Sequence, residues 1–196
     1  AFTASQDTQR VDFGFTEPFF MDRPLRAGVD LLAVQRDRQD ESSFDERVYS
    51  GGLRLGYDIN ERLRQDWGYT FRMTEIFDVG TDASQTIKDE EGLRYTSSIR
   101  HSLNWDFRDN IILPGSGYFF GFTNEFAGIG GNVRFLKNDI EAGFFLPVTE
   151  GVVFSVTGNA GTVFGIGQDV LTSNRYFIGQ QEIRGFESSG IGARDS

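Results

Sequence analysis

Few side chains in this sequence are of the types that carry out covalent or metal chemistry. The 196 residues include a single histidine, His101, and no cysteine, so a disulfide or a thiolate metal site is ruled out. The acidic runs DRQDE and KDEEG lack the spacing of a calcium-binding loop and are predicted to be solvated loop charges. No motif sets a nucleophile beside a base. We therefore expect no enzymatic activity, no metal and no cofactor, with a structural role for His101.

The remaining charged side chains recur at alternate positions within apolar segments. Such spacing places both signs of charge on one face of a strand, where they can form ion pairs with neighbouring strands. The charged positions of this kind that we expect to face a polar interior are Arg54, Arg72, Arg100, Lys137, Asp139 and Glu141.

An all-β fold is predicted from the same alternation. In residues 51–60, Leu53, Leu55 and Tyr57 share one face, and Arg54 lies on the other. The short polar link to the next segment predicts a hairpin. Eight segments alternate in this way: 11–20, 25–34, 51–60, 65–73, 93–105, 118–126, 136–148 and 152–161.

The composition agrees with a β protein and excludes several partners. Glycine (24 residues) weakens helices, whereas phenylalanine (20 residues) needs apolar surroundings, and strands tolerate both. A net charge of -10 disfavours nucleic acid. No apolar run reaches the roughly 18 residues of a transmembrane helix. The first residues lack a signal-peptide pattern, so an exported chain would be a mature or internal piece.

Two architectures fit eight alternating strands. A soluble sandwich or lipocalin-like barrel would bury its apolar face, whereas a membrane barrel would turn that face to lipid and its polar face to a lumen. Strands of about nine to eleven residues, and short turns (MDRP, NER, PVTEG) that alternate with long polar loops, favour an antiparallel transmembrane barrel. This architecture predicts that the following side chains point outward: Phe13, Leu55, Trp67, Phe71, Trp105, Phe122 and Phe144.

The last residues, RYFIGQQEIRGFESSGIGARDS, resemble a long extracellular loop of BamA-like outer-membrane assembly factors, the bacterial surface antigen family. Ile183 stands where that family usually has valine, and Arg184, Gly185 and Phe186 follow in order; Gln180 replaces a glycine of the pattern. FTEPFF, DINERL, DNIILPGSGYFF and FFLPV resemble further family segments in the same order.

The resemblance implies that the eight strands are the middle of a sixteen-stranded barrel, its fourth to eleventh strands. Residues 1–163 would then hold the transmembrane strands and residues 164–196 the extracellular loop. Arg184 is expected to meet carboxylates on the inner wall, Gly185 to permit a turn and Phe186 to wedge against the wall.

The resemblance also implies a location and a set of partners. The intact protein would fold and insert outer-membrane proteins in the outer membrane of Gram-negative bacteria, without covalent chemistry. Its partners would be outer-membrane lipid, unfolded outer-membrane proteins and accessory lipoproteins of the assembly complex. The eight strands alone are expected to close into a small barrel or to self-associate through strand edges. The alternatives are a related barrel transporter for protein translocation or secretion, and an independent eight-stranded pore.

Overall fold

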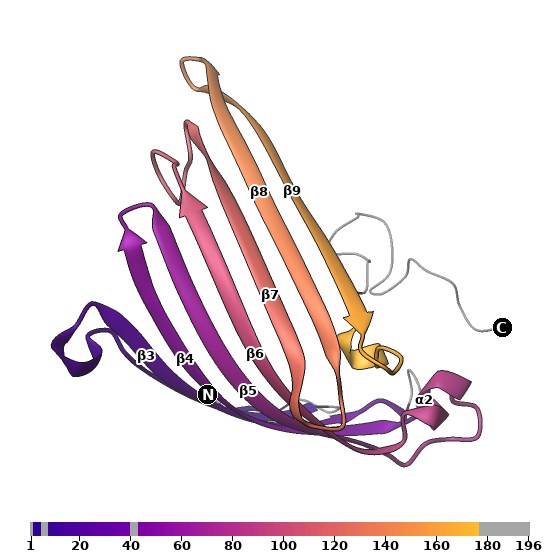
Figure 1. The fold of residues 1–196 in the computed structure, drawn as a ribbon. Coiled ribbons are helices and arrows are strands. Elements are labelled where there is room, and N and C mark those ends of the chain that lie inside the picture. Colours follow the sequence, from indigo (N-terminus) through magenta and orange to yellow (C-terminus); the bar gives the residue numbers. More distant parts are fainter. Residues whose placement is uncertain (1, 5–7, 40–42, 177–196) are drawn as a thin grey trace.

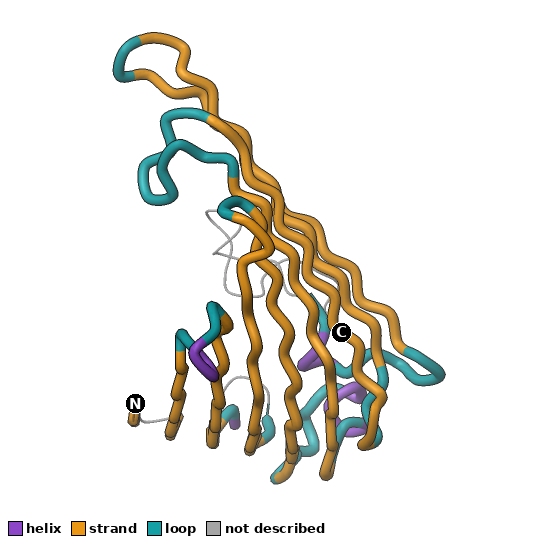
Figure 2. Tube along the Cα trace, turned by 60° about the vertical axis from the view of Figure 1, so that its left-hand side comes forward, coloured by secondary structure: helices purple, strands orange, loops and turns teal. Residues whose placement is uncertain are grey.

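The computed structural model describes residues 2–4, 8–39 and 43–176, and places their strands in one antiparallel sheet. Figure 2 shows the strands side by side in a single continuous layer. The nine strands follow one another in chain order: β1 (Phe2–Ala4), β2 (Thr8–Glu17), β3 (Leu25–Asp37), β4 (Asp45–Asn60), β5 (Leu63–Phe77), β6 (Gly92–Asp106), β7 (Gly117–Gly131), β8 (Phe135–Thr149) and β9 (Val152–Gly165). The helical elements are η1 (Phe20–Asp22), α2 (Gln85–Asp89) and η2 (Thr172–Asn174).

All eight predicted strands are present, as β2 to β9, and β1 adds a short ninth strand. The predicted length of nine to eleven residues is wrong for β3 to β9, which span 13 to 16 residues. The extra length arises where the apolar side chains change face. Val34 and Val48 are directly paired on the otherwise polar face and are buried there, so the alternation breaks although the pairing continues.

The sheet twists strongly and stays open, so that β3 and β9 run in clearly different directions (Figure 1). In the described residues β9 pairs only with β8, and β1 only with β2. Closure of these strands into a small barrel, one of the two expected outcomes, is therefore not observed, because the curvature does not bring the edges together. Association through strand edges stays a prediction.

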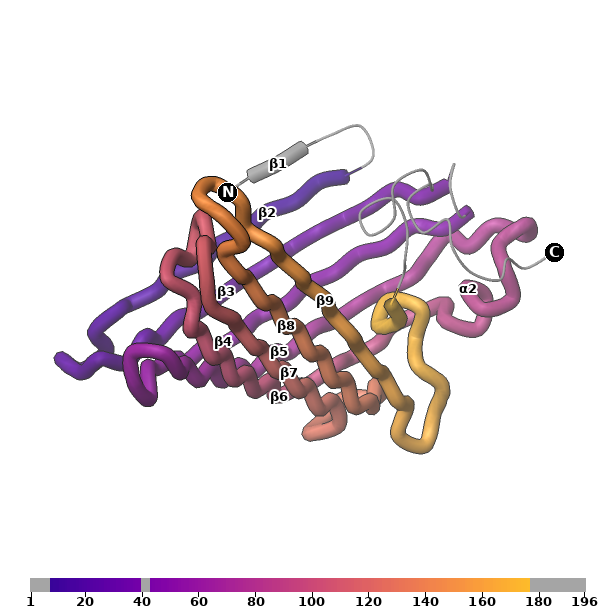
Figure 3. Tube along the Cα trace, turned by 90° about the horizontal axis from the view of Figure 1, so that it is seen from above, coloured from indigo at the N-terminus to yellow at the C-terminus, as the bar shows by residue number. Residues whose placement is uncertain are grey.

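The connections differ between the two ends of the strands. The turns after β2, β4, β6 and β8 lie at one end, and α2 and η2 lie at the other (Figure 1). Long loops do follow β3 and β5, but β7 and β8 are joined by residues 132–134 alone. The predicted alternation of short turns and long loops thus fails at this connection and also between β6 and β7, where the RDNIILPGSG segment makes residues 107–116 long for the short-turn end. Seen from above, the chain continues from β9 into residues 166–176, drawn in yellow (Figure 3).

Among the residues that the structure describes, apolar burial is confined to the end of the sheet that carries the long loops. One cluster joins Phe44, Ile76, Ala83 and Ile87 around α2, and a second joins Ala127, Val133 and Phe135. Leu171 packs against the second cluster. These clusters anchor the loops onto the sheet. Within the described ranges, no helix is both long and apolar enough to cross a lipid bilayer.

The connection between β6 and β7 is organised by one carboxylate. Asp109 Oδ1 accepts hydrogen bonds from the backbone N–H groups of Asn110, Gly115 and Ser116, at 2.9, 2.9 and 3.0 Å. Because these bonds favour the charged form, they hold the pKa of Asp109 below its ordinary value. Gly117 follows with φ 102°, where an added Cβ would collide with the Phe107 carbonyl oxygen.

Acid should loosen this connection. The pKa of Asp109 is lowered in the folded state, so its stabilising contribution is present above the unfolded value of about 3.9 and is lost as the pH falls through the folded value. We expect the hydrogen-exchange protection factors of the Gly115 and Ser116 amides to fall as the pH drops below about 4 and Asp109 becomes protonated. The Asp109→Asn variant, which has no titrating group there, should lose this pH dependence; an unchanged profile would contradict the assignment.

Candidate functional site

The two faces of the sheet differ in chemistry along its whole width. The strand register puts most aromatic and aliphatic side chains on one face, here called the apolar face, and most ion pairs on the other, the polar face. The Arg47–Glu75 ion pair lies on the apolar face, at the end of β4 and β5 that carries the long loops. The seven residues predicted to point outward all lie on the apolar face, and Phe13, Leu55, Trp67, Phe71 and Phe144 are exposed there. No apolar layer formed by described residues covers them, so in the described part of the chain this face lacks the packing of a soluble core.

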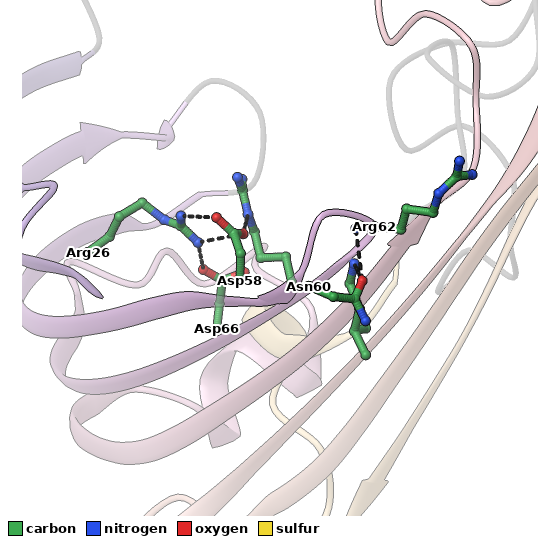
Figure 4. Close-up of polar contacts among 7 residues, drawn as sticks. Arg26, Asp58, Asn60, Arg62 and Asp66 are labelled. Atoms are coloured by element: carbon green, nitrogen blue, oxygen red, sulfur yellow. Dashed lines mark hydrogen bonds and ion pairs between the residues drawn. The ribbon is translucent and has the colours of Figure 1, made fainter. Parts of the chain in front are cut away.

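Ion pairs join β3, β4 and β5 across the polar face. Asp58 Oδ2 lies 3.0 Å from Arg26 Nη1, and Asp58 Oδ1 lies 3.0 Å from Arg64 Nε. Asp66 approaches Arg26 at 4.0 Å (Figure 4). At the nearby turn, Asn60 Oδ1 accepts from the backbone N–H of Arg62 at 2.9 Å, which fixes the start of β5 (Figure 4). This group of charges is balanced in sign and bridges three strands.

The arginines predicted to face an interior all lie on the polar face. Arg54 donates to Thr16 Oγ1 at 3.2 Å and forms an ion pair with Asp30. Arg100 forms an ion pair with Glu125 at 3.2 Å. All three arginines line one cavity of about 580 Å³ on this face. None of the ion pairs between described residues includes Arg72.

The segment after β9 crosses the polar face. Tyr176 donates a hydrogen bond to Asp139 Oδ1 at 2.5 Å, and Lys137 Nζ lies 4.1 Å from the centroid of the Tyr176 ring. The pKa of Tyr176 is raised, mainly because the hydroxyl is partly buried and in addition because it donates a hydrogen bond to Asp139. Gly161 leaves room for the ring, because an added Cβ would lie 2.5 Å from its hydroxyl oxygen. Ser173 and Asn174 line the cavity that holds Arg72.

A buried carboxylate ties this segment to the loop between β5 and β6. Glu90 Oε1 accepts from the Thr172 backbone N–H at 2.7 Å and from Thr172 Oγ1 at 2.9 Å. Glu90 is only 7% exposed. The prediction that the KDEEG run is simply solvated is therefore wrong for Glu90, because loop 78–91 and residues 171–174 fold over it.

The remaining predicted residues make packing contacts on the sheet or lie outside the described residues. Glu141 lies opposite Gly121 on the polar face, where its Cγ fills the space beside the glycine. Ile183, Arg184, Gly185 and Phe186 lie outside the described residues. His101 lies on the apolar face, with its ring centroid 4.3 Å from that of Trp67, and shares a hydrogen bond of 2.8 Å with Gln65.

Sequence reasoning missed Glu90, Thr172 and Tyr176. Their contacts join residues that are 82 and 37 positions apart in the chain, and no local pattern marks such contacts. The only hint was the position of KDEEG directly before a predicted strand. The candidate site is thus the polar face of the sheet together with residues 171–176, which Glu90 and Asp139 hold against it. Its charged and polar side chains can bind other groups by ion pairs and hydrogen bonds.

Comparisons with known proteins agree on one family. The sequence profile of the Omp85 superfamily domain matches residues 1–196. The chain is 35% identical over 183 residues to the outer membrane protein assembly factor BamA of Neorickettsia risticii, covering 92% of this chain and 24% of the relative. It is 30% identical over 185 residues to BamA of Nitratidesulfovibrio vulgaris, covering 92% and 23%. A SAM50-like protein of Drosophila melanogaster is 26% identical over 190 residues, covering 91% and 42%.

A solved structure has the same fold. The crystal structure of BamA from Haemophilus ducreyi lacking POTRA domains 1–3 superposes with a TM-score of 0.81 at 15% identity, covering 95% of this chain and 39% of that chain. The chain thus spans about a quarter of the length of the two BamA relatives. The nine described strands correspond to part of a larger barrel wall.

Proposed function

Because this chain belongs to the Omp85 superfamily, we propose that it forms part of the barrel wall of a factor that folds and inserts outer-membrane proteins. The observation that carries the proposal is the distribution of side chains, which is the reverse of that in a soluble β protein. Aromatic residues are exposed on one face of the sheet, and ion pairs lie on the other. In a bilayer the apolar face contacts lipid and the polar face lines a lumen. The protein resides in the bacterial outer membrane.

Binding, rather than covalent chemistry, is the role that this wall supports. In the described part of the chain, each of β2 to β8 pairs with a neighbouring strand on both sides, which supplies the backbone hydrogen bonds that the hydrocarbon region requires. The polar face offers paired charges and the cavity beside Arg72, which suit contacts with chain segments rather than catalysis. The partners of the intact protein are outer-membrane lipid, unfolded outer-membrane proteins and accessory lipoproteins.

The path of residues 171–176 supports a lumenal position for the loop that carries Arg184. These residues lie on the polar face, held by Glu90 and Asp139, and the chain runs on from there toward the Arg-Gly-Phe sequence. A guanidinium in a lumen can form two parallel hydrogen bonds with a carboxylate of the wall, which lysine cannot do. Arg184, with Ile183, Gly185 and Phe186, would then hold the loop inside the barrel.

Substituting Arg184 in the full-length protein tests the function and the loop together. We expect Arg184→Ala to slow barrel assembly in proteoliposomes, because a charge-assisted contact contributes about 1.5 to 3 kcal/mol. Arg184→Lys should restore part of the rate, because it keeps the charge but loses the second hydrogen bond. Arg194→Ala is the matched control. Equal rates for the two alanine variants would refute the role of Arg184, and no assembly by the unaltered protein would refute the proposed function.

A further inference from the structure

A line of hydrogen-bonded polar side chains crosses the apolar face of the sheet. It begins on β4 and β5, where Tyr57 donates to Gln65 at 2.5 Å, and continues from Gln65 to His101 on β6 at 2.8 Å. On the next strands, Asn124 donates to Asn138 at 2.6 Å, and Asn138 donates to Thr162 at 3.5 Å. Asn124 and His101 are opposite each other in the register. These polar side chains lie among aromatic and aliphatic residues. The same face also carries the Tyr69–Ser97 hydrogen bond and, next to the long loops, the Arg47–Glu75 ion pair.

The line supplies what the polar face lacks at the later strand junctions. On the polar face, β3 and β4 are joined by ion pairs such as Arg54–Asp30, and β6 and β7 by Arg100–Glu125. Between β7 and β8, the Asn124–Asn138 bond is the only side-chain hydrogen bond among described residues. Asn138–Thr162 holds the same position between β8 and β9.

A bilayer makes the register of such strands hard to specify. A shift by two residues keeps every side chain on its own face. The apolar residues therefore stay in lipid, and their contribution to the free energy changes little. An amide is different, because a hydrogen-bonding group without a partner in hydrocarbon is costly. A two-residue shift of β8 against β7 would place Asn124 opposite Leu136 or Ile140 and leave both asparagines without their bond.

We propose that Asn124, Asn138 and Thr162 set the register of β7, β8 and β9 in the membrane, by forming hydrogen bonds in one alignment only. The inference rests on the proposed lipid-facing position of the apolar face. The Asn124–Asn138 pair is the fourth of the eleven paired positions of β7 and β8, counted from the connection at residues 132–134, so it lies within the paired stretch and not at its end. The two asparagines form the central contact, and Thr162 extends it to β9.

Disulfide trapping can measure the register, because this sequence has no cysteine. In the full-length protein, freed of other cysteines and reconstituted in phosphatidylcholine liposomes, the pair Gly121→Cys and Glu141→Cys reports the native alignment. The pair Thr123→Cys and Glu141→Cys reports a shift by two residues, since diagonal neighbours are too far apart to bridge readily. We expect Asn124→Leu or Asn138→Leu to raise the shifted cross-link about three- to fivefold relative to the native one.

Phe122→Leu is the matched control, since it alters an apolar side chain of the same strand and face, and it should leave the ratio unchanged. Unchanged ratios in both asparagine variants, or an equal rise in the control, would overturn the proposal while the assembly function stands. A separate label tests the premise. Phe122→Cys should resist a water-soluble maleimide in liposomes, and full labelling would refute the lipid-facing position and with it the proposal.

Discussion

Replacing Phe122 with arginine should destabilise the folded protein in a bilayer by about 2 to 4 kcal/mol. Phe122 lies near the middle of β7 on the apolar face, opposite Leu103 and Ile140. A guanidinium at this depth has no described anion beside it, so it must either lose its hydration or bend away to an interface. The measurement is the free energy of unfolding by guanidinium chloride in liposomes, compared with the unaltered protein.

The neighbouring residue provides the control for this prediction. Thr123 points to the polar face, where its hydroxyl shares a hydrogen bond of 2.9 Å with Ser102. Thr123→Arg loses that bond but keeps its charge in a polar lumen, so it should cost much less than Phe122→Arg. Similar losses at the two positions would show that the faces are not divided between lipid and water.

Replacing Glu90 with alanine should be the most damaging change among the loops, at about 1 to 3 kcal/mol. The carboxylate accepts two hydrogen bonds from Thr172 while almost fully buried, and its removal leaves the Thr172 N–H and hydroxyl without their acceptor. We expect residues 171–176 to detach from the polar face. Hydrogen exchange of the Thr172 amide should accelerate, and unfolding should occur at lower denaturant concentration.

Two variants separate the hydrogen bonds of Glu90 from its charge. Glu90→Gln keeps an acceptor oxygen and should retain most of the protection at Thr172. Glu91→Ala removes an exposed charge from the next position and should have little effect. If Glu91→Ala were as damaging as Glu90→Ala, general loop electrostatics rather than the Thr172 contact would be responsible.

The fold was largely predictable because a strand with one apolar and one polar side alternates between apolar and polar residues in its sequence. Leu53, Leu55 and Tyr57 against Arg54 are enough to place β4. The alternation fails where the surroundings of the strand change, as at Val34 and Val48, which are buried on the polar face beside residues 171–174. The resemblance to BamA-like proteins, based on short motifs in a fixed order, is confirmed by the match to the family over residues 1–196.

The site was less predictable because its contacts join distant segments. The charges at Arg54, Arg72, Arg100, Lys137, Asp139 and Glu141 could be assigned to one face, but not the partner of each. Nothing near Asp139 in the sequence indicates Tyr176, and nothing near Glu90 indicates Thr172. Likewise, nothing in the alternation indicates that Asn124 and Asn138 lie opposite each other, which only the register shows.

The tether between Glu90 and Thr172 has a consequence for the order of folding. Its two ends are separated by 82 residues, and strands β6 to β9 lie between them in the chain. Forming a contact between residues so far apart in the sequence has a large cost in loop-closure entropy, unless the intervening strands are already paired. Residues 171–176 are therefore expected to bind to the sheet only after β6 to β9 have paired, which makes the Glu90–Thr172 contact a late step of folding.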